Sequence, residues 1–237
     1  MIPLRDANPT RRRPVVTYAL IAICTVVFGL ELWIQATQGD AALERFLTDY
    51  GAVASRISRG PTSASLIGLI TSQFLHGGWL HLGGNMLYLW IFGNNVEDRF
   101  GRLGYLLFYL AGGVAAALTQ VAIDPTSSAP LIGASGAIAA VLGAYLVLYP
   151  GARVLSLVFL GFFYQLINVP ALIVLVLWFG LQLLSGFMSL GAGSAVDSGV
   201  AVFAHIGGFV FGLAVGLLLR VVGAGTGRDR RASGSMG

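Results

Sequence analysis

Long apolar runs, one after another along the chain, constrain the fold more than any other feature of this sequence. A helix needs about 20 mostly apolar residues to cross the hydrocarbon core of a membrane. Six runs approach or exceed that length: Val15–Gln35, Leu80–Val96, Gly104–Ile123, Leu131–Tyr149, Ala171–Leu190 and Val200–Val222. Only 10% of the residues are charged, whereas soluble domains carry about 25%. We therefore predict an all-α polytopic membrane protein built on a bundle of six transmembrane helices.

The arginines are distributed unevenly among the connections between these runs. With six spans, both termini lie on the same side of the membrane, and 11 of the 14 basic residues lie there with them. Arg45, Arg56 and Arg59 lie on the other side. Cytoplasmic connections are enriched in basic residues. We therefore predict an integral protein of a bacterial plasma membrane, with both termini in the cytoplasm.

The predicted organisation has three parts: a cytoplasmic segment over residues 1–14, a membrane domain over 15–222 and a disordered cytoplasmic tail over 223–237. The arginines sit at the ends of apolar runs and do not line one face, so we expect no nucleic-acid partner. The lipid bilayer is the expected surrounding of the membrane domain.

Four connecting segments carry further expectations. Val154–Ile167 is apolar but has only 14 residues, so we expect it to lie in the membrane interface or to re-enter the membrane, and not to span it. Residues 36–78 form a long external segment that we expect to pack on the membrane surface. Residues 191–199 are predicted to be a flexible external loop. Glu97-Asp98-Arg99 is interpreted as the solvated end of the second span.

Polar residues of three different runs are predicted to lie at one depth. Ser135, His205 and the pair His81 and Asn85 each fall near the outer end of a run, within about 10 Å of the external surface at 1.5 Å per residue. A lone serine or histidine in a span is more often a packing residue or interhelical glue. Ionisable groups at membrane depth are costly, however, and mark function by default. Four such residues at one level are difficult to assign to packing alone.

Helical spacing predicts how two of these residues meet. His205 shares a helix face with Gly208 and Gly212, and the run that contains Ser135 carries a surface of small residues: Gly136, Ala139, Ala140 and Gly143. Small residues let transmembrane helices approach each other closely. We therefore predict that these two faces pack together and bring the imidazole of His205 to the hydroxyl of Ser135.

This pair could carry out acyl transfer. A serine hydroxyl is a weak nucleophile until a base takes its proton, and histidine titrates near neutral pH. His81, Asn85 and the backbone N–H of Ser135 could donate hydrogen bonds to the developing oxyanion. We find no carboxylate near these residues at membrane depth, since Asp124 and Asp197 are interpreted as loop residues. The sequence therefore predicts a Ser–His dyad and not a triad.

A metal site is the less favoured reading of the histidines. His76, His81 and His205 could bind zinc, but no carboxylate stands beside them and no H-E-x-x-H motif is present. His76 precedes two glycines and is expected to support a loop. We expect no cofactor and no metal.

Three segments together resemble the signature of the rhomboid intramembrane serine proteases: "HGGWLHLGGNMLYLWIFGNNVEDRFG", "GASGAIAAVLGAY" and "AHIGGFVFG". The resemblance extends from the second run to the sixth. It implies a six-helix core with a water-filled cavity that opens to the external side. Its expected site residues are Ser135 as nucleophile, His205 as general base, His81 and Asn85 as oxyanion stabilisers, and Gly133, Gly136 and His76 as supporting residues.

The resemblance also implies the partners: single-span membrane proteins, cleaved at or just inside the membrane, with the fifth span and the following loop gating their entry.

Two positions depart from the family pattern. Ala139 replaces an aromatic residue that stacks on the catalytic histidine, so His205 must be oriented by packing or by an aromatic such as Phe203. Ile67-Gly68 replaces a Trp-Arg pair, which bears on how the first external loop is anchored.

Two functions of other classes remain as alternatives. One is a non-catalytic rhomboid-like protein that binds membrane clients, for which Ala139 leaves room. The other is a small-solute transporter, which is less favoured because transporter sites lie near the midplane of the membrane.

Overall fold

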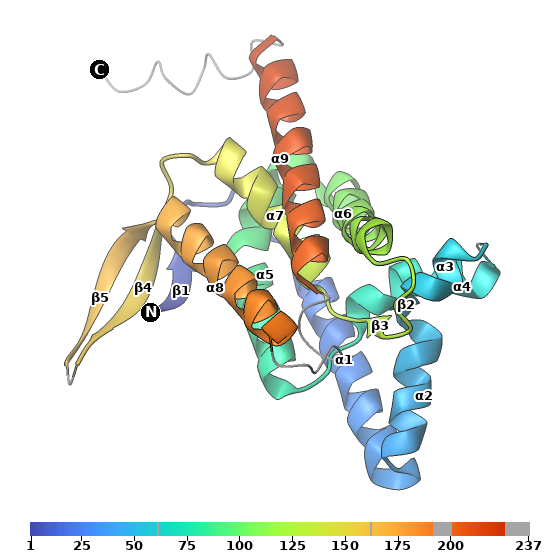
Figure 1. Ribbon diagram of the computed structural model, residues 1–237. Coiled ribbons are helices and arrows are strands. Elements are labelled where there is room, and N and C mark those ends of the chain that lie inside the picture. The colour runs from blue at the N-terminus through green and yellow to red at the C-terminus, as the bar shows by residue number, and fades with distance from the viewer. Residues whose placement is uncertain (61, 162, 192–200, 226–237) are drawn as a thin grey trace, which may run out of the picture.

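The computed structural model describes residues 1–60, 62–161, 163–191 and 201–225, and these residues are mostly helical (Figure 1). The long helices are α1 (Val15–Gln38), α5 (Trp79–Phe100), α6 (Arg102–Ile123), α7 (Ser135–Leu148), α8 (Ala171–Gly191) and α9 (Ala201–Gly225). Helix α7 lies at the centre and packs against α5, α6 and α9. Its residues from Ala137 to Tyr145 are all buried. The functional hydroxyl predicted from the sequence therefore belongs to the most enclosed helix.

Each of the six predicted spans coincides with one of these long helices. Among the described residues, three helical stretches are long and apolar enough to cross a membrane: Val15–Gln38, Arg102–Ile123 and Val202–Val222. Ser135–Leu148 and Ala171–Leu181 are shorter apolar helices, and α5 carries Glu97, Asp98 and Arg99 in its last turns. The bundle of apolar helices is therefore present, and the count of six spans stays a prediction.

Two small sheets correct the expectation of an all-α chain. β1 (Ile2–Asp6), β4 (Arg153–Leu160) and β5 (Phe163–Pro170) form an antiparallel sheet in the order β1-β4-β5. β2 (Ala52–Val53) pairs with β3 (Pro130–Leu131). The short apolar run over 154–167 thus forms a hairpin, with Leu157 opposite Leu166. Gly161 supplies the positive φ of +65° next to its turn, a conformation that favours glycine.

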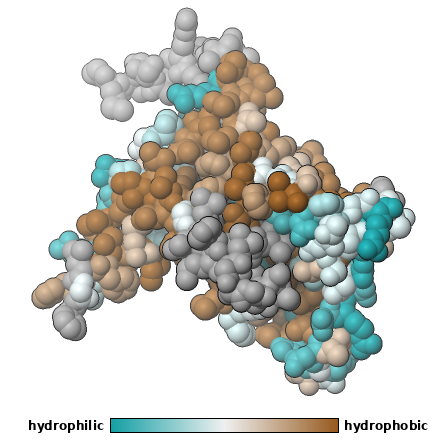
Figure 2. All heavy atoms as spheres, viewed as in Figure 1, coloured by the Kyte–Doolittle hydropathy of each residue, from teal (hydrophilic) through white to brown (hydrophobic). Residues whose placement is uncertain are grey.

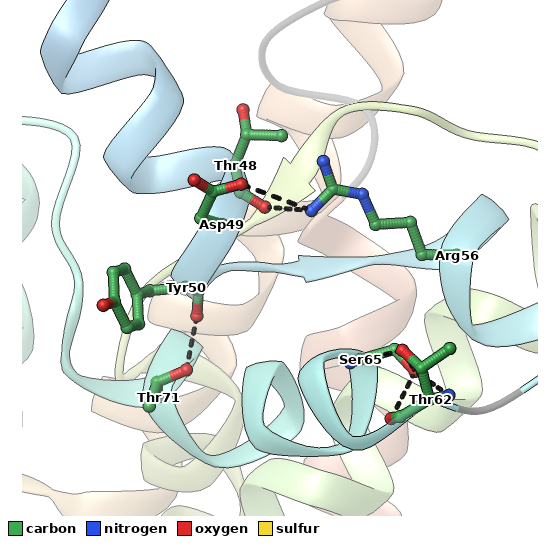
Figure 3. Close-up of polar contacts among 7 residues, drawn as sticks. All are labelled: Thr48, Asp49, Tyr50, Arg56, Thr62, Ser65 and Thr71. Atoms are coloured by element: carbon green, nitrogen blue, oxygen red, sulfur yellow. Dashed lines mark hydrogen bonds and ion pairs between the residues drawn. The ribbon is translucent and has the colours of Figure 1, made fainter.

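The long connection after α1 folds into short elements: α2 (Asp40–Tyr50), α3 (Ala54–Ser58), α4 (Ser63–Thr71) and the 3₁₀ turn η1 (Ser72–Phe74). Polar contacts join them (Figure 3). Arg56 Nη1 donates to the carbonyl of Thr48 at 2.9 Å, and Thr71 Oγ1 donates to the carbonyl of Tyr50 at 2.5 Å. Hydrophilic residues gather over this part of the molecule, whereas the central helices are hydrophobic (Figure 2). The segment leads directly to Ser72 at the site.

The sequence predicted a solvated end for α5, and this is wrong for Glu97, which is buried; Asp98 is half-buried and Arg99 is exposed. Glu97 is only 3% exposed, and it accepts hydrogen bonds from the backbone N–H groups of Val16 and Thr17 and from the Thr17 hydroxyl. Asp98 accepts from the backbone N–H groups of Arg11 and Arg12. Helix α1 has no capping side chain of its own, so its first N–H groups require acceptors from elsewhere. Glu97 supplies them for Val16 and Thr17, whereas Asp98 binds the segment just before the helix.

The two ends of the last helix also bear on the predictions. Helix α9 continues to Gly225, so residues 223–225 belong to it and not to a tail. The predicted tail beyond this point and the predicted loop over 192–199 lie outside the described residues. At the other end of the chain, the segment over residues 1–14 contributes strand β1, which pairs with β4.

Candidate active site

Ser135 is the first residue of α7, and the chain reaches it through a glycine with a positive φ. Gly133 has φ +121°, a conformation that side chains rarely adopt, and its N–H donates to the Ser72 carbonyl at 2.8 Å. A Cβ at Gly133 would lie 2.6 Å from Nε2 of His81 and 3.6 Å from Oγ of Ser135. Glycine is therefore required here for both conformation and space. Because Ser135 opens the helix, its own N–H has no partner within α7.

The small faces of α7 and α9 pack together as predicted. A Cβ at Gly208 would meet the backbone oxygen of Gly136, and a Cβ at Gly212 would meet the backbone of Ala140. The glycines thus let the two backbones touch. This contact brings His205 to Ser135, with 2.7 Å between Nε2 and Oγ. The predicted approach of the imidazole and the hydroxyl is confirmed.

Packing surrounds the imidazole of His205. The residue is 3% exposed, and its Nδ1 has no hydrogen-bond partner among the described residues. The ring of Trp178 on α8 lies beside it, with ring centroids 5.6 Å apart and an angle of 55° between the planes. Phe203, which the sequence suggested for this role, is 39% exposed. Trp178 was missed because the rotation of α8 about its axis is not encoded in any motif.

His81 reaches the same point from α5. Its Nδ1 accepts a hydrogen bond from the N–H of Gly77 at 3.3 Å, and its Nε2 faces Gly133 beside the Ser135 hydroxyl. Asn85 lies one turn further along α5, where it is buried, and its Nδ2 has no partner in the part of the chain that is described. The structure therefore brings Ser135, His205 and His81 together and leaves Asn85 a turn away.

A buried carboxylate lies behind the histidines, and the expectation that none exists at this depth was wrong. Glu31 on α1 is 2% exposed and accepts from the backbone N–H of His76 at 3.1 Å. The ring of His76 meets that of His81 edge-on, with centroids 5.2 Å apart. Burial, aided by His81, lowers the pKa of the His76 imidazole to about 4. Glu31 is the one acidic residue within the first apolar run, a signal that could have revealed it.

Glu31 binds backbone and not imidazole, so it does not turn the pair of Ser135 and His205 into a triad. His76 supports the loop that carries Gly77, since its Nδ1 also contacts the Phe74 carbonyl at 3.2 Å. This agrees with the supporting role expected for His76.

A small cavity adjoins the Ser135 hydroxyl and the His205 ring. It offers about 20 Å³ to the centre of a water molecule, and Ser72, Gln73 and Gly133 also line it. Gln73 donates to the carbonyls of Leu69 and Leu110 at 3.0 and 3.2 Å, while its Oε1 has no partner within the described residues. A water needs about 10–15 Å³ of such space. The cavity therefore has room for one water next to an available acceptor.

The family model of the rhomboid domain matches residues 63–221 of this chain. The chain belongs to the rhomboid family. Its curated relatives include the rhomboid protease GluP of Bacillus subtilis, 31% identical over 205 residues, which are 86% of this chain and 36% of that protein. Rhomboid protein 1, mitochondrial, of Saccharomyces cerevisiae is 34% identical over 149 residues, 60% of this chain and 39% of that protein. The resemblance expected from the three motifs is confirmed.

A shorter match is to the chloroplastic rhomboid-like protein 11 of Arabidopsis thaliana, 41% identical over 69 residues, 29% of this chain and 24% of that protein. The rhomboid chain spans less than half the length of each of these relatives. The matched region contains Ser135, His81 and His205. Together with the apolar helices, membership of this family makes the chain an integral membrane protein.

Proposed function

We propose that this rhomboid chain is an intramembrane serine endopeptidase that cleaves transmembrane segments of single-span membrane proteins with a Ser135–His205 dyad. The observation that carries the proposal is the 2.7 Å contact between His205 Nε2 and Ser135 Oγ. The name of the B. subtilis relative, a rhomboid protease, supports the same reaction class.

The dyad geometry supports a two-step hydrolysis. Ser135 Oγ attacks the carbonyl carbon of the scissile peptide while His205 Nε2 takes the hydroxyl proton. The imidazolium gives this proton to the leaving amine when the C–N bond breaks, which leaves an acyl-enzyme. A water then attacks the ester carbonyl, His205 takes a proton from the water, and the proton returns to Ser135 Oγ as the acid product leaves.

The oxyanion requires donors that are aimed at its developing charge. Gly77 N–H donates to Nδ1 of His81, so the proton of a neutral His81 is assigned to Nε2. This Nε2 faces Gly133, beside the Ser135 hydroxyl, and is the first proposed donor. The backbone N–H of Ser135, unpaired at the start of α7, is the second proposed donor. Asn85 Nδ2, buried and without a partner in the described chain, is the third.

The second half of the reaction requires a water molecule near Ser135. The cavity beside Ser135 and His205 has room for one water, and the Oε1 of Gln73 can accept a hydrogen bond from it. We infer that this cavity supplies the hydrolytic water, and that the site opens to the external side of a plasma membrane with both termini cytoplasmic. The uneven distribution of arginines supports this orientation.

The test compares variants in vesicles that also contain a fluorogenic single-span model substrate. Ser135→Ala and His205→Ala should each lower cleavage by about 10⁴-fold or more, while the unfolding temperature stays within a few degrees of the wild type. Ser156→Ala is the control at another serine, since Ser156 is buried away from the site and binds only the carbonyl of Val154. A Ser135→Ala variant that cleaves at the wild-type rate would contradict the proposal.

A serine-reactive fluorophosphonate probe separates the protease from the client-binding alternative. Ser135 should be labelled in the wild type and in Ser156→Ala, and labelling should be lost in Ser135→Ala and strongly slowed in His205→Ala. An unlabelled wild-type protein that still binds a single-span protein would favour the non-catalytic alternative, which the small residue Ala139 leaves open.

A further inference from the structure

We propose that Trp178 on α8 is the positioning residue that holds the imidazole of His205 in line with Ser135. The proposal rests on the dyad function above. It extends that function to a residue on a different helix, α8, which packs against α9.

A single hydrogen bond does not fix the plane of the His205 ring. Nε2 contacts Ser135 Oγ at 2.7 Å, but Nδ1 is buried and unpartnered within the described residues. Rotation about the side-chain bonds would therefore be limited only by what packs against the ring faces. A group that orients the base must act through that packing.

Trp178 provides this contact and is itself held in place. Its ring centroid lies 5.6 Å from that of His205 and 5.7 Å from that of Tyr88 on α5. Both distances fall in the range of favourable aromatic pairs, about 4.5–7 Å. The indole thus links α5 to α9, and its position beside His205 is determined by two rings on two helices.

Helix α7 does not supply such a ring. Ala139, one turn after Ser135, is fully buried and carries only a methyl group. The ring that packs on His205 comes from Trp178 on α8.

The indole also favours the charged state that His205 passes through. An aromatic face within about 6 Å of a cation stabilises that cation, and the imidazolium forms only when Ser135 loses its proton. Trp178 should therefore act on the chemical step more than on substrate binding.

The kinetic test uses Trp178→Leu, Trp178→Phe and the control Phe179→Leu in the same vesicles with the fluorogenic substrate. Trp178→Leu should lower kcat by about 5- to 10-fold, with KM within twofold, and slow fluorophosphonate labelling by the same factor. Trp178→Phe should recover most of this loss. Phe179 is the adjacent α8 ring and packs on Phe209, with centroids 5.5 Å apart, so Phe179→Leu should keep kcat within twofold.

Two results would overturn the inference: equal kcat values for Trp178→Leu and Phe179→Leu, or a Trp178→Phe variant as slow as Trp178→Leu. The Ser135→Ala variant distinguishes a failure of this inference from a failure of the proposed protease function. If Ser135→Ala still cleaves, the dyad fails; if it is inactive and Trp178→Leu is fast, only the role of Trp178 fails.

A spectroscopic readout checks the contact without any substrate. The four tryptophans are replaced by 5-fluorotryptophan, and the ¹⁹F resonance absent from Trp178→Phe is assigned to Trp178. This resonance should shift in His205→Ala and should follow the titration of His205 in the wild type. A Trp178 resonance that is the same in both proteins would contradict the proposed contact.

Discussion

The two ends of the bundle differ in how most of their buried polar groups are paired, although the Tyr105 hydroxyl near the start of α1 also lacks a partner among the described residues. At the end where α1 begins, the Glu97 carboxylate accepts three hydrogen bonds, and Asp6 accepts from Asn8 and Asn95. At the end where α7 begins, several buried atoms have no partner within the described residues: His205 Nδ1, Asn85 Nδ2, His76 Nε2 and Gln73 Oε1. Buried polar groups in folded proteins are normally paired. The first arrangement suits stability, and the second leaves groups available for a substrate and a water.

Apart from the loss of Ser135 or His205, the largest expected effect belongs to the end where α7 begins. His81→Ala should lower kcat by about 10²- to 10³-fold, equivalent to about 2.7–4 kcal/mol of transition-state stabilisation. The free energy of unfolding should change by less than about 1 kcal/mol, because His81 accepts only one long hydrogen bond in the resting state. Leu80→Ala is the control on the same turn, since Leu80 is 94% exposed. Parallel losses of activity and stability in His81→Ala would remove the contrast between the two ends.

The complementary experiment changes Glu97, at the end of the bundle where α1 begins. Glu97→Ala leaves two backbone N–H groups and one hydroxyl of α1 without an acceptor, so it should lower the free energy of unfolding by about 2–3 kcal/mol. The kcat of the folded fraction should stay within twofold. Asp98→Ala tests the neighbouring carboxylate, whose hydrogen bonds are exposed, and should cost less than about 1 kcal/mol. Chemical unfolding in detergent, followed by activity per folded molecule, distinguishes these outcomes.

A substitution in the contact between α7 and α9 should affect both the stability of the protein and the reactivity of Ser135. Gly212→Ala places a Cβ against the backbone of Ala140, so it should cost about 1–3 kcal/mol by overpacking. It should also slow fluorophosphonate labelling, because α9 carries His205. Gly29→Ala is the matched control, since nothing lies within 4 Å of a Cβ there, and it should be neutral or slightly stabilising. Labelling that is unchanged in Gly212→Ala would show that the small-residue contact does not set the position of the dyad.

The sequence could predict contacts that depend on one helix face meeting another. The spacing of Gly208 and Gly212 behind His205 indicated the packing with α7, and with it the 2.7 Å contact to Ser135. Residues three or four positions apart lie on the same face of a helix, so the sequence alone shows which residues share these faces. The run containing Ser135 was predicted to begin at Leu131, whereas α7 begins at Ser135 itself, after the turn that contains Gly133.

Contacts between distant segments could not be predicted in the same way. Glu97 contacts Thr17, which is 80 positions away, and Glu31 contacts His76, which is 45 positions away. Trp178 reaches His205 only because α8 is rotated to direct that residue inward. Each depends on how two helices are placed relative to each other, which no local period encodes. The hairpin over 154–167 was missed as a strand pair because a short apolar run does not distinguish a strand from a helix.

The smallest effect concerns the pH dependence of the β1 sheet. Burial raises the pKa of the Asp6 carboxyl above 3.8, and hydrogen bonds from Asn8 oppose this only in part. A raised carboxyl pKa means that the folded state binds the proton more tightly than the unfolded state. Asp6 should therefore contribute stability as the pH falls through its folded pKa, and this contribution should be lost as the pH rises again. Hydrogen exchange of the β1 amides between pH 4 and 7 should show a difference below about 1 kcal/mol between wild type and Asp6→Asn. The wild type should gain protection relative to Asp6→Asn toward pH 4, and the opposite slope would mean that the ionised carboxylate is the better partner of Asn95.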